Sequence, residues 1–431
     1  MSAARVGLFL LFVFSPWLAT AEPAYVDLGT VMELAGANND EIELARVRHQ
    51  ESLAKEKLAW HRFWPTISLG TAFRGHDGRV QDIAGLVFDA SKRQYTLGTE
   101  ILIDWSPGDI YFGALAAGQT ALAAEHLAES TRREVVLEAI RRYYDLLAAD
   151  ASLAIIEEDL RLTQDYAQQL EGAVAAGTAF RADLLRLQTQ VSRAKLAVLQ
   201  GAESRDLASA ALAETLRVPP QTELRAAKAD LLPVSLIDGV ELTLQIDEAT
   251  RKRPEMQAAA ASQEAAALER ERARLAPLIP NLRTGYTMGG LAGGVTGDPG
   301  NLADAHDYFV GIGWKIGPGG LFDKQSQSIA EARQSAAALD ANRVKAAIGR
   351  DVVETSARAK SAHDRIGIND EAVAAAEEMV KLAEERQASQ LGVVLEYLLA
   401  REELTRAKQD RVKAVTEFNT AQHELRRALG R

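Results

Sequence analysis

The 431-residue sequence contains no cysteine and few long apolar runs. Without cysteine, disulfides, thiol catalysis and thiolate metal sites are excluded, and we expect no lipid anchor on an N-terminal cysteine. After residue 21 no stretch of about eighteen apolar residues occurs, so we expect no membrane-spanning helix. Basic residues are outnumbered, with 49 Lys and Arg against 60 Asp and Glu. This acidic balance argues against a nucleic-acid partner.

Patterns of catalytic residues are also missing. The seven histidines show no metal-ligand spacing. The glycine-rich segment Gly289–Gly297 lacks the Gly-Lys-Ser/Thr ending of a phosphate-binding loop and lies between two predicted strands, so we interpret it as a hairpin loop. We therefore expect no catalytic residue, no metal and no cofactor, and we expect that the chain is not an enzyme.

The first apolar run is predicted to be an export signal. Arg5 precedes the apolar stretch 6–14, and Ala19-Thr20-Ala21 supplies the small residues that a signal peptidase requires. We expect Met1–Ala21 to be a secretory signal peptide. The alternative is a buried first helix.

The most regular feature that is present is a helical run from about Leu321 to Gln390. Over its second half, small and apolar residues recur in steps of four and three, the spacing of a coiled-coil seam. The seam consists of Ile348, Val352, Thr355, Ala359, Ala362, Ile366, Asn369, Val373, Ala376, Val380 and Ala383. At about 1.5 Å per residue this helix would reach roughly 100 Å, which suits a strut, a tether or a tunnel wall.

The chain also repeats itself. Four landmarks recur in the same order: Asn39–Ile42 and Arg253–Met256, Pro65–Gly70 and Pro280–Gly285, Trp105 and Trp314, Ser192–Lys195 and Thr405–Lys408. We predict a first repeat over 22–217, a connecting segment over 218–245 and a second repeat over 246–431.

Each repeat has the same predicted elements. The first has a helix at 28–63, strands at about 66–76 and 94–105 with a loop over 75–93, a long helix at about 112–175 and a returning helix at 182–216. The second has a helix at 246–275, strands at about 281–290 and 307–316, a long helix at about 322–390 and a returning helix at 394–429. The long helices are joined to the returning helices by turns at Gly177 and Gly392.

The predicted strands are apolar on one face and small or polar on the other. The apolar face carries Leu97, Ile101, Ile103, Trp105, Val310, Ile312 and Trp314. Such alternation over about ten residues is typical of transmembrane barrel strands, and terminal aromatic residues suit a membrane interface. A soluble, half-buried hairpin has the same alternation. If these residues face lipid, arginine at Ile101 should disrupt the barrel, while serine at Gly98 on the other face should be tolerated.

The motifs around these turns resemble those of a known family. Gly177, Asp183-Leu-Leu and Arg193-Ala-Lys195 are similar to a glycine, acidic and alanine-lysine pattern of the TolC-like outer-membrane efflux proteins, or outer-membrane factors, of Gram-negative bacteria. Gly392, Glu396-Tyr-Leu398 and Arg406-Ala-Lys408 resemble it again, and Arg253-Pro254-Glu255 resembles the marker before the second copy. The resemblance covers essentially the whole chain after the signal.

The resemblance implies a mixed α/β membrane protein, mostly α, that forms a homotrimer in the outer membrane. Each chain would give four strands to a twelve-stranded β-barrel, and the helical hairpins would form a long periplasmic tunnel. The implied function is the passive exit duct of a tripartite efflux or type I secretion system. Its partners would be a periplasmic adaptor, an inner-membrane pump of RND, ABC or MFS type, and outer-membrane lipid. The cargo stays open among drugs, metal ions, polysaccharide and protein.

The rival hypothesis is a periplasmic coiled-coil adaptor or structural protein without a membrane barrel. It would require a β-rich domain beside one helical hairpin, and the sequence has none.

The family pattern also implies a gate at the periplasmic end. Glu396 occupies the acidic position after the second turn, and Leu399 stands where some relatives have a second acidic residue. The first repeat offers Asp183 with Arg186 behind it. We predict one carboxylate ring, from Glu396, made partly apolar by Leu399. Alternatively, Glu396 is a solvated residue favoured by the helix macrodipole.

Overall fold

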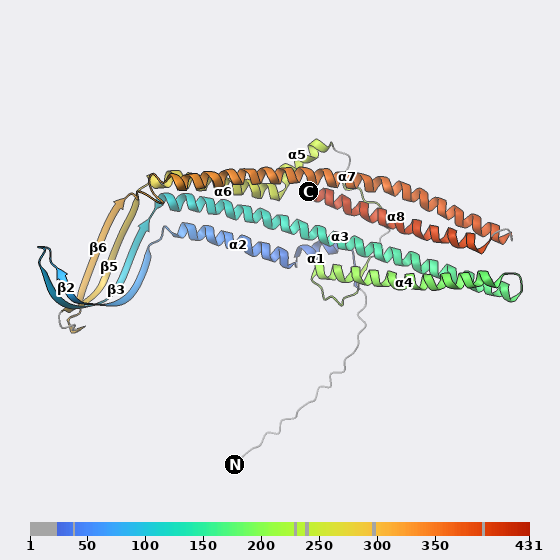
Figure 1. Ribbon diagram of the computed structural model, residues 1–431, viewed down its shortest axis with the longest axis horizontal. Helices are drawn as coiled ribbons and strands as arrows, with labels where there is room; N and C mark the ends of the chain where they lie inside the picture. Colours follow the sequence, from blue (N-terminus) through green and yellow to red (C-terminus); the bar gives the residue numbers. More distant parts are fainter. Residues whose placement is uncertain (1–23, 38, 228–230, 238–240, 295–298, 390–392) are drawn as a thin grey trace, which may run out of the picture. The chain divides into compact units, whose positions relative to one another are not determined.

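The computed structural model describes residues 24–37, 39–227, 231–237, 241–294, 299–389 and 393–431. Long helices and one antiparallel sheet dominate the described part (Figure 1). The predicted signal peptide Met1–Ala21 and the predicted turn residue Gly392 lie outside the described residues. None of the helices in the described ranges has a segment long and apolar enough to cross a membrane.

The two long helices are longer than any other element. Helix α3 spans Pro107–Ala175 and α7 spans Lys324–Ala388. The returning helices are α4, Arg181–Leu216, and α8, Val394–Ala428. Helix α3 begins earlier than the predicted 112, because Pro107 is well suited to the first helical position, where its missing N–H has no partner to lose.

The predicted seam of α7 is confirmed by burial. Nine of its eleven residues are buried, and the other two, Asn369 and Val373, are half-buried. Alanine at Ala359, Ala362 and Ala376 leaves little side chain between α7 and its neighbours, which allows a close approach.

Each of the two predicted shorter helices is divided in the structure. The first consists of α1, Leu28–Ala37, and α2, Asp40–His61, whose first turn carries three acidic residues that favour a helix start. The second consists of α5, Leu242–Lys252, and α6, Pro254–Leu275. Pro254 divides them because it biases Arg253 to the extended conformation, with φ −71° and ψ 130°.

The four long strands form one sheet in the order β2-β3-β5-β6, antiparallel throughout. Their bounds are Thr66–Gln81 for β2, Val87–Trp105 for β3, Asn281–Gly294 for β5 and Ala303–Gly313 for β6. Strand β5 runs past the predicted end near 290, and β6 begins before the predicted 307 and ends before the predicted 316.

The loop predicted over 75–93 is wrong. Strands β2 and β3 continue as a two-stranded ribbon to a turn at residues 82–86. Asp82 closes this turn, because its backbone N–H donates to the Leu86 carbonyl at 3.0 Å and its carboxylate accepts from the Leu86 N–H at 2.8 Å. Between the turn and Arg93, β3 does not pair with β5.

Two short strands in the N-terminal and connecting segments were not predicted. Strand β1, Ala24–Val26, pairs in parallel with β4, Leu224–Ala226. The N–H of Leu224 also donates to Oγ of the buried Ser209 at 2.8 Å. The predicted connecting segment 218–245 therefore contains an ordered strand.

The chain forms two compact units, and each draws on both predicted repeats. The first unit comprises the described residues within 1–39, 138–234 and 360–420, and the second those within 40–137, 235–359 and 421–431. The division into two repeats stays a prediction about sequence symmetry. The two compact units instead reflect which helices pack together.

A buried cluster of charges lies in the second unit. The Arg253 side chain, 7% exposed, contacts Glu255 at 3.0 Å and Asp351 at 2.5 Å. Arg427 contacts both of these carboxylates, at 3.2 and 3.0 Å, and also Glu134 at 2.8 Å. Burial by itself would raise the pKa of Glu255, but the hydrogen bonds and charge of Arg253, with the charge of Arg427, lower it to about 2. The cluster connects the start of α6 to α7 and α8.

Candidate functional site

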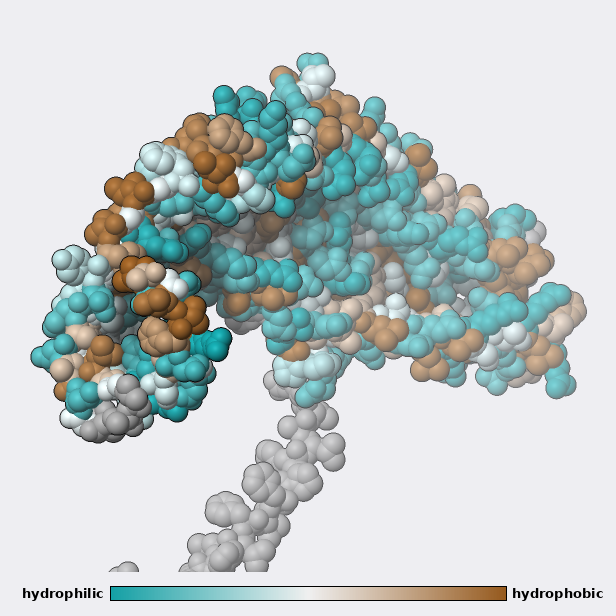
Figure 2. Space-filling model, turned by 60° about the vertical axis from the view of Figure 1, so that its left-hand side comes forward, coloured by the Kyte–Doolittle hydropathy of each residue, from teal (hydrophilic) through white to brown (hydrophobic). Residues whose placement is uncertain are grey.

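One face of the sheet is largely apolar. Cross-strand partners project to the same face of a sheet, so the pairs Ile67–Ile101, Ile101–Tyr286 and Tyr286–Tyr308 form one row. The rows Ile103–Thr284–Val310 and Trp105–Leu282–Ile312 follow it. Brown, apolar side chains lie at the surface where the strands come forward in Figure 2, and Val310 is 74% exposed.

The register therefore gathers the predicted lipid-facing residues of β3 and β6 on one face: Leu97, Ile101, Ile103, Trp105, Val310 and Ile312. Trp314 lies just beyond the end of β6, and its indole N–H donates to the Leu278 carbonyl at 3.1 Å. That this face contacts lipid stays a prediction.

The opposite face is lined by glycine where the strands meet. Gly70, Gly98 and Gly289 occupy paired positions on β2, β3 and β5. A Cβ at Gly98 would lie 2.5 Å from the Met288 carbonyl oxygen, and one at Gly289 would lie 2.0 Å from the Leu97 carbonyl oxygen. The expectation that serine is tolerated at Gly98 is wrong, because the backbones of β3 and β5 are too close. Gly70 has open space on the same face.

The predicted gate residue Glu396 lies near the start of α8, and it is paired. Its Oε1 accepts a hydrogen bond from Nη1 of Arg386, near the end of α7, at 2.6 Å. Arg386, Glu396 and Leu399 line one groove of about 620 Å³ together with Met379, Leu382, Ala383, Ala400, Glu402, Glu403 and Arg406. Leu399 is 57% exposed there, so the groove combines apolar and charged side chains.

Sequence reasoning missed Arg386. Antiparallel helices joined by a short turn bring residues at equal distances from the turn together, so counting back from the turn would have paired position 386 with 396. The pair is exposed, and its net stabilising effect is therefore small. Its consequence is electrostatic, because a cation accompanies each predicted gate carboxylate.

The other predicted turn of a helical hairpin, here called a tip, lies at Gly177 between α3 and α4. Gly177 has φ 71°, and the N–H of Thr178 donates to the Ala173 carbonyl at 2.9 Å, closing the helix end. Asp183 is paired with Arg186, with 3.4 Å between Nη1 and Oδ1. No contact between Asp183 and Glu396 occurs among the described residues.

A hydrophobic cluster in the first unit supports both tips. It brings Tyr166 of α3 against Tyr397 of α8, with ring centroids 4.7 Å apart, and it includes Leu187 of α4 and Val380 of α7. Burial raises the pKa of Tyr166 and of Tyr397, so both remain neutral hydrogen-bonding groups. The first turns of α4 and α8 are thereby fixed against the ends of α3 and α7.

Two further contacts support the same region. Gln387 donates a hydrogen bond to the Tyr166 hydroxyl. The nearly buried pair of Arg401 and Asp159 connects α8 to α3 at 3.0 Å. Among the described residues no cluster of His, Asp and Glu could hold a metal ion.

Comparison with known sequences identifies related proteins. The sequence model of the outer membrane efflux protein family matches residues 31–216 and 245–431. Protein CyaE of Bordetella pertussis is 29% identical over 162 residues, a match that covers 37% of this chain and 34% of CyaE. The matched segment thus spans about a third of the length of that relative.

The fold is similar to that of solved membrane proteins. A membrane protein from Pseudomonas aeruginosa gives a TM-score of 0.79 at 20% identity, covering 94% of this chain and 93% of that one. The outer membrane protein VceC from Vibrio cholerae gives 0.76 at 20% identity, covering 94% and 96%. The CmeC outer membrane channel from Campylobacter jejuni gives 0.79 at 13% identity, covering 100% and 93%.

These findings confirm the expected family and the mostly helical fold with its sheet. The family match includes the Gly177 and Asp183 region, the Arg253-Pro254-Glu255 segment and the Glu396 region that suggested the resemblance. The chain belongs to the outer membrane efflux protein family.

Proposed function

We propose that the chain is the outer-membrane exit duct of a tripartite efflux or type I secretion system. It assembles as a homotrimer whose sheets close a twelve-stranded barrel in the outer membrane, with the helices extending into the periplasm. Family membership supports this function over the rival hypothesis of a periplasmic adaptor without a barrel. The duct is passive and needs no cofactor.

The observation that carries the proposal is the sheet with its two open edges. Among the described residues β2 pairs only with β3, and β6 pairs only with β5. An open edge inside hydrocarbon would leave backbone N–H and C=O groups unsatisfied, at a cost of several kcal/mol each. The apolar face requires lipid or protein against it. If it lies in lipid, the two edges must pair with further strands to satisfy their backbone groups.

A second copy supplies those strands with the correct polarity. Because the strands alternate in direction and each chain contributes an even number, β6 of one copy runs antiparallel to β2 of the next. A head-to-tail contact of this kind closes when the rotation completes a ring. Twelve strands lie within the range of bacterial outer-membrane barrels, whose strand numbers are even.

The proposed partners follow from the family. A periplasmic adaptor would contact the ends of the helical hairpins, and an inner-membrane pump of RND, ABC or MFS type would supply the energy. The proposed gate is the ring of three Glu396 carboxylates with Leu399 beside them. Arg386 partly neutralises each carboxylate, so the ring attracts cations less strongly than three unpaired carboxylates would.

Cross-linking can test the assembly, and the cysteine-free chain is well suited to it. Variants that carry one cysteine in β2 and one in β6 should give covalent trimers only when the two cysteines lie on the same face of the sheet. Cysteine pairs within the exposed part of α2 serve as the control and should give none. Detergent, and not salt, should release the protein from outer membranes. A monomer released by salt would refute the proposed duct.

A further inference from the structure

We propose that the ribbon of β2 and β3 holds a binding site for a soluble polyvalent anion that carries phosphate or carboxylate groups. The site is formed by Arg74, His76, Lys92 and Gln94. The proposal rests on the proposed function only in placing this site inside the channel.

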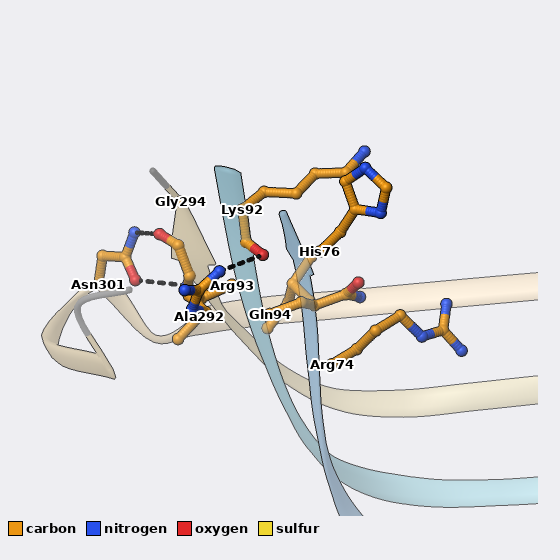
Figure 3. A pocket seen from close by; sticks show the side chains of 10 residues that line it. Arg74, His76, Lys92, Arg93, Gln94, Ala292, Gly294 and Asn301 are labelled. Carbon is orange, nitrogen blue, oxygen red and sulfur yellow. Dashed lines mark hydrogen bonds between the residues drawn. The ribbon is translucent and has the colours of Figure 1, made fainter. Parts of the chain in front are cut away.

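The register brings these four side chains together. Arg74 of β2 is paired with Gln94 of β3, and His76 is paired with Lys92. The two pairs are separated by two positions along each strand, so all four side chains project from one face. Figure 3 shows them extending in the same direction from the two strands.

The side chains line a groove of about 500 Å³. Its other lining residues are Arg93, Leu291, Ala292, Gly293, Gly294 and Asn301. Asn301 fixes the wall of β5, because its side chain accepts from the Gly293 N–H at 2.8 Å and donates to the Gly293 carbonyl at 2.6 Å. Gly294, at the end of β5, has no atom within 4 Å of the position that a Cβ would take.

Two positive side chains of the groove, Arg74 and Lys92, have no negative partner among the described residues. Among the described residues, no acidic residue lines the groove, and neither Arg74 nor Lys92 forms an ion pair. Nε2 of His76 is buried and has no hydrogen-bond partner. By contrast, Arg93 is paired with Asp77 at 2.8 Å, and Arg79 lies 3.8 Å from Asp89.

This arrangement fits an anion with more than one charge. A guanidinium offers paired donors that match the oxygens of phosphate and carboxylate, and an ammonium supplies a second positive charge. The site continues the face of Gly70 and Gly98, while the apolar residues occupy the opposite face. A solute in the channel, and not a lipid headgroup, therefore reaches it.

Titration of the detergent-solubilised full chain with inorganic pyrophosphate tests the site without requiring a membrane. At low ionic strength the wild type should bind pyrophosphate, and added salt should weaken the binding. The double variant Arg74→Gln with Lys92→Gln should weaken it by about tenfold or more, the loss expected when charge-assisted hydrogen bonds are removed. Arg74→Lys with Lys92→Arg keeps both charges and should retain binding, provided that its circular dichroism matches the wild type.

The matched control removes two cations that already have partners. Arg79→Gln with Arg283→Gln changes the net charge equally, and Arg283 is paired with Asp104 at 2.8 Å away from the groove. This control should bind pyrophosphate as the wild type does. No binding by the wild type, or equal loss in the control, would overturn the proposal.

A second measurement locates the site relative to the channel. In planar bilayers, pyrophosphate on the outer side should reduce the single-channel conductance of the wild type and not that of the Arg74→Gln, Lys92→Gln variant. Binding in detergent together with an insensitive open channel would refute the internal location and leave the duct intact. Absence of any channel would refute the duct and leave the anion site standing. If phosphatidic acid vesicles bound the protein and pyrophosphate did not, the cations would be assigned to lipid and the proposal would be refuted.

Discussion

Replacing Glu255 by glutamine should destabilise the second unit strongly. The Glu255 side chain is 22% exposed and accepts hydrogen bonds from Arg253, Arg427 and Ser130. The difference between a pKa of about 2 in the folded protein and the ordinary value of 4.5 corresponds to about 3 kcal/mol. That figure lies within the range of about 3–5 kcal/mol for removing one partner of a buried ion pair.

The pH dependence has a definite sign. Because folding lowers the pKa of Glu255, its contribution is fully present above pH 4.5 and is lost as the pH falls from 4.5 to about 2. Unfolding by denaturant in detergent, followed by helical circular dichroism, should show Glu255→Gln less stable than the wild type at neutral pH. The difference between the two proteins should shrink towards pH 2.

An exposed pair provides the matched control. Glu158 is paired with Arg161 one helical turn away, and both side chains are more than half exposed. Glu158→Gln should leave the free energy of unfolding nearly unchanged, because water and salt screen such pairs. If Glu255→Gln were equally harmless, or kept the wild-type slope between pH 4.5 and 2, the cluster would not stabilise the protein as argued.

Three further experiments test other parts of the molecule. Ile101→Arg should cost about 2–4 kcal/mol near a bilayer midplane and lower the amount of trimer in outer-membrane fractions. Gly70→Ser should have no effect, since nothing lies within 4 Å of the added Cβ. Equal losses of trimer in the two variants would refute the assigned faces. In single-channel recordings Glu396→Gln should weaken cation selectivity. Arg386→Gln should strengthen it, because the arginine pairs with that carboxylate at 2.6 Å. Unchanged selectivity in both variants would place the gate elsewhere. Burial, with the charge of Arg426, lowers the pKa of His423 to about 4. The free energy of unfolding should therefore fall by about 3 kcal/mol as the pH drops from 6.5 to 4. In acid-unfolding curves, His423→Gln should remove this dependence.

The long helices could be predicted from the sequence because their signal is local and regular. The steps of four and three from Ile348 to Ala383 specify a buried stripe whatever the neighbouring helices are. The ribbon over 75–93 could not be predicted in the same way. Its strands are held by polar cross-strand pairs such as Arg93 with Asp77, which leave no apolar alternation to recognise.

The site residues that sequence reasoning missed depend on register and turn geometry. Lys92 and His76 are distant in the sequence and become neighbours only through the β2–β3 pairing. Arg386 meets Glu396 because α7 and α8 reverse direction between them. The close approach at Gly98 likewise follows from its partner Gly289, which neither strand reveals alone.

The row of glycines across the sheet also influences how the sheet bends. Gly70, Gly98 and Gly289 leave one row across three adjacent strands without side chains on that surface, while Ile101 and its partners fill a row of the other surface. When a sheet curls, side chains on its concave surface are crowded together and those on its convex surface are spread apart. Glycine at defined positions relieves that crowding and permits strong curvature. The sheet can therefore curl towards its glycine side with little resistance, which agrees with that side as the inner wall and the apolar side as the outer wall of the proposed barrel.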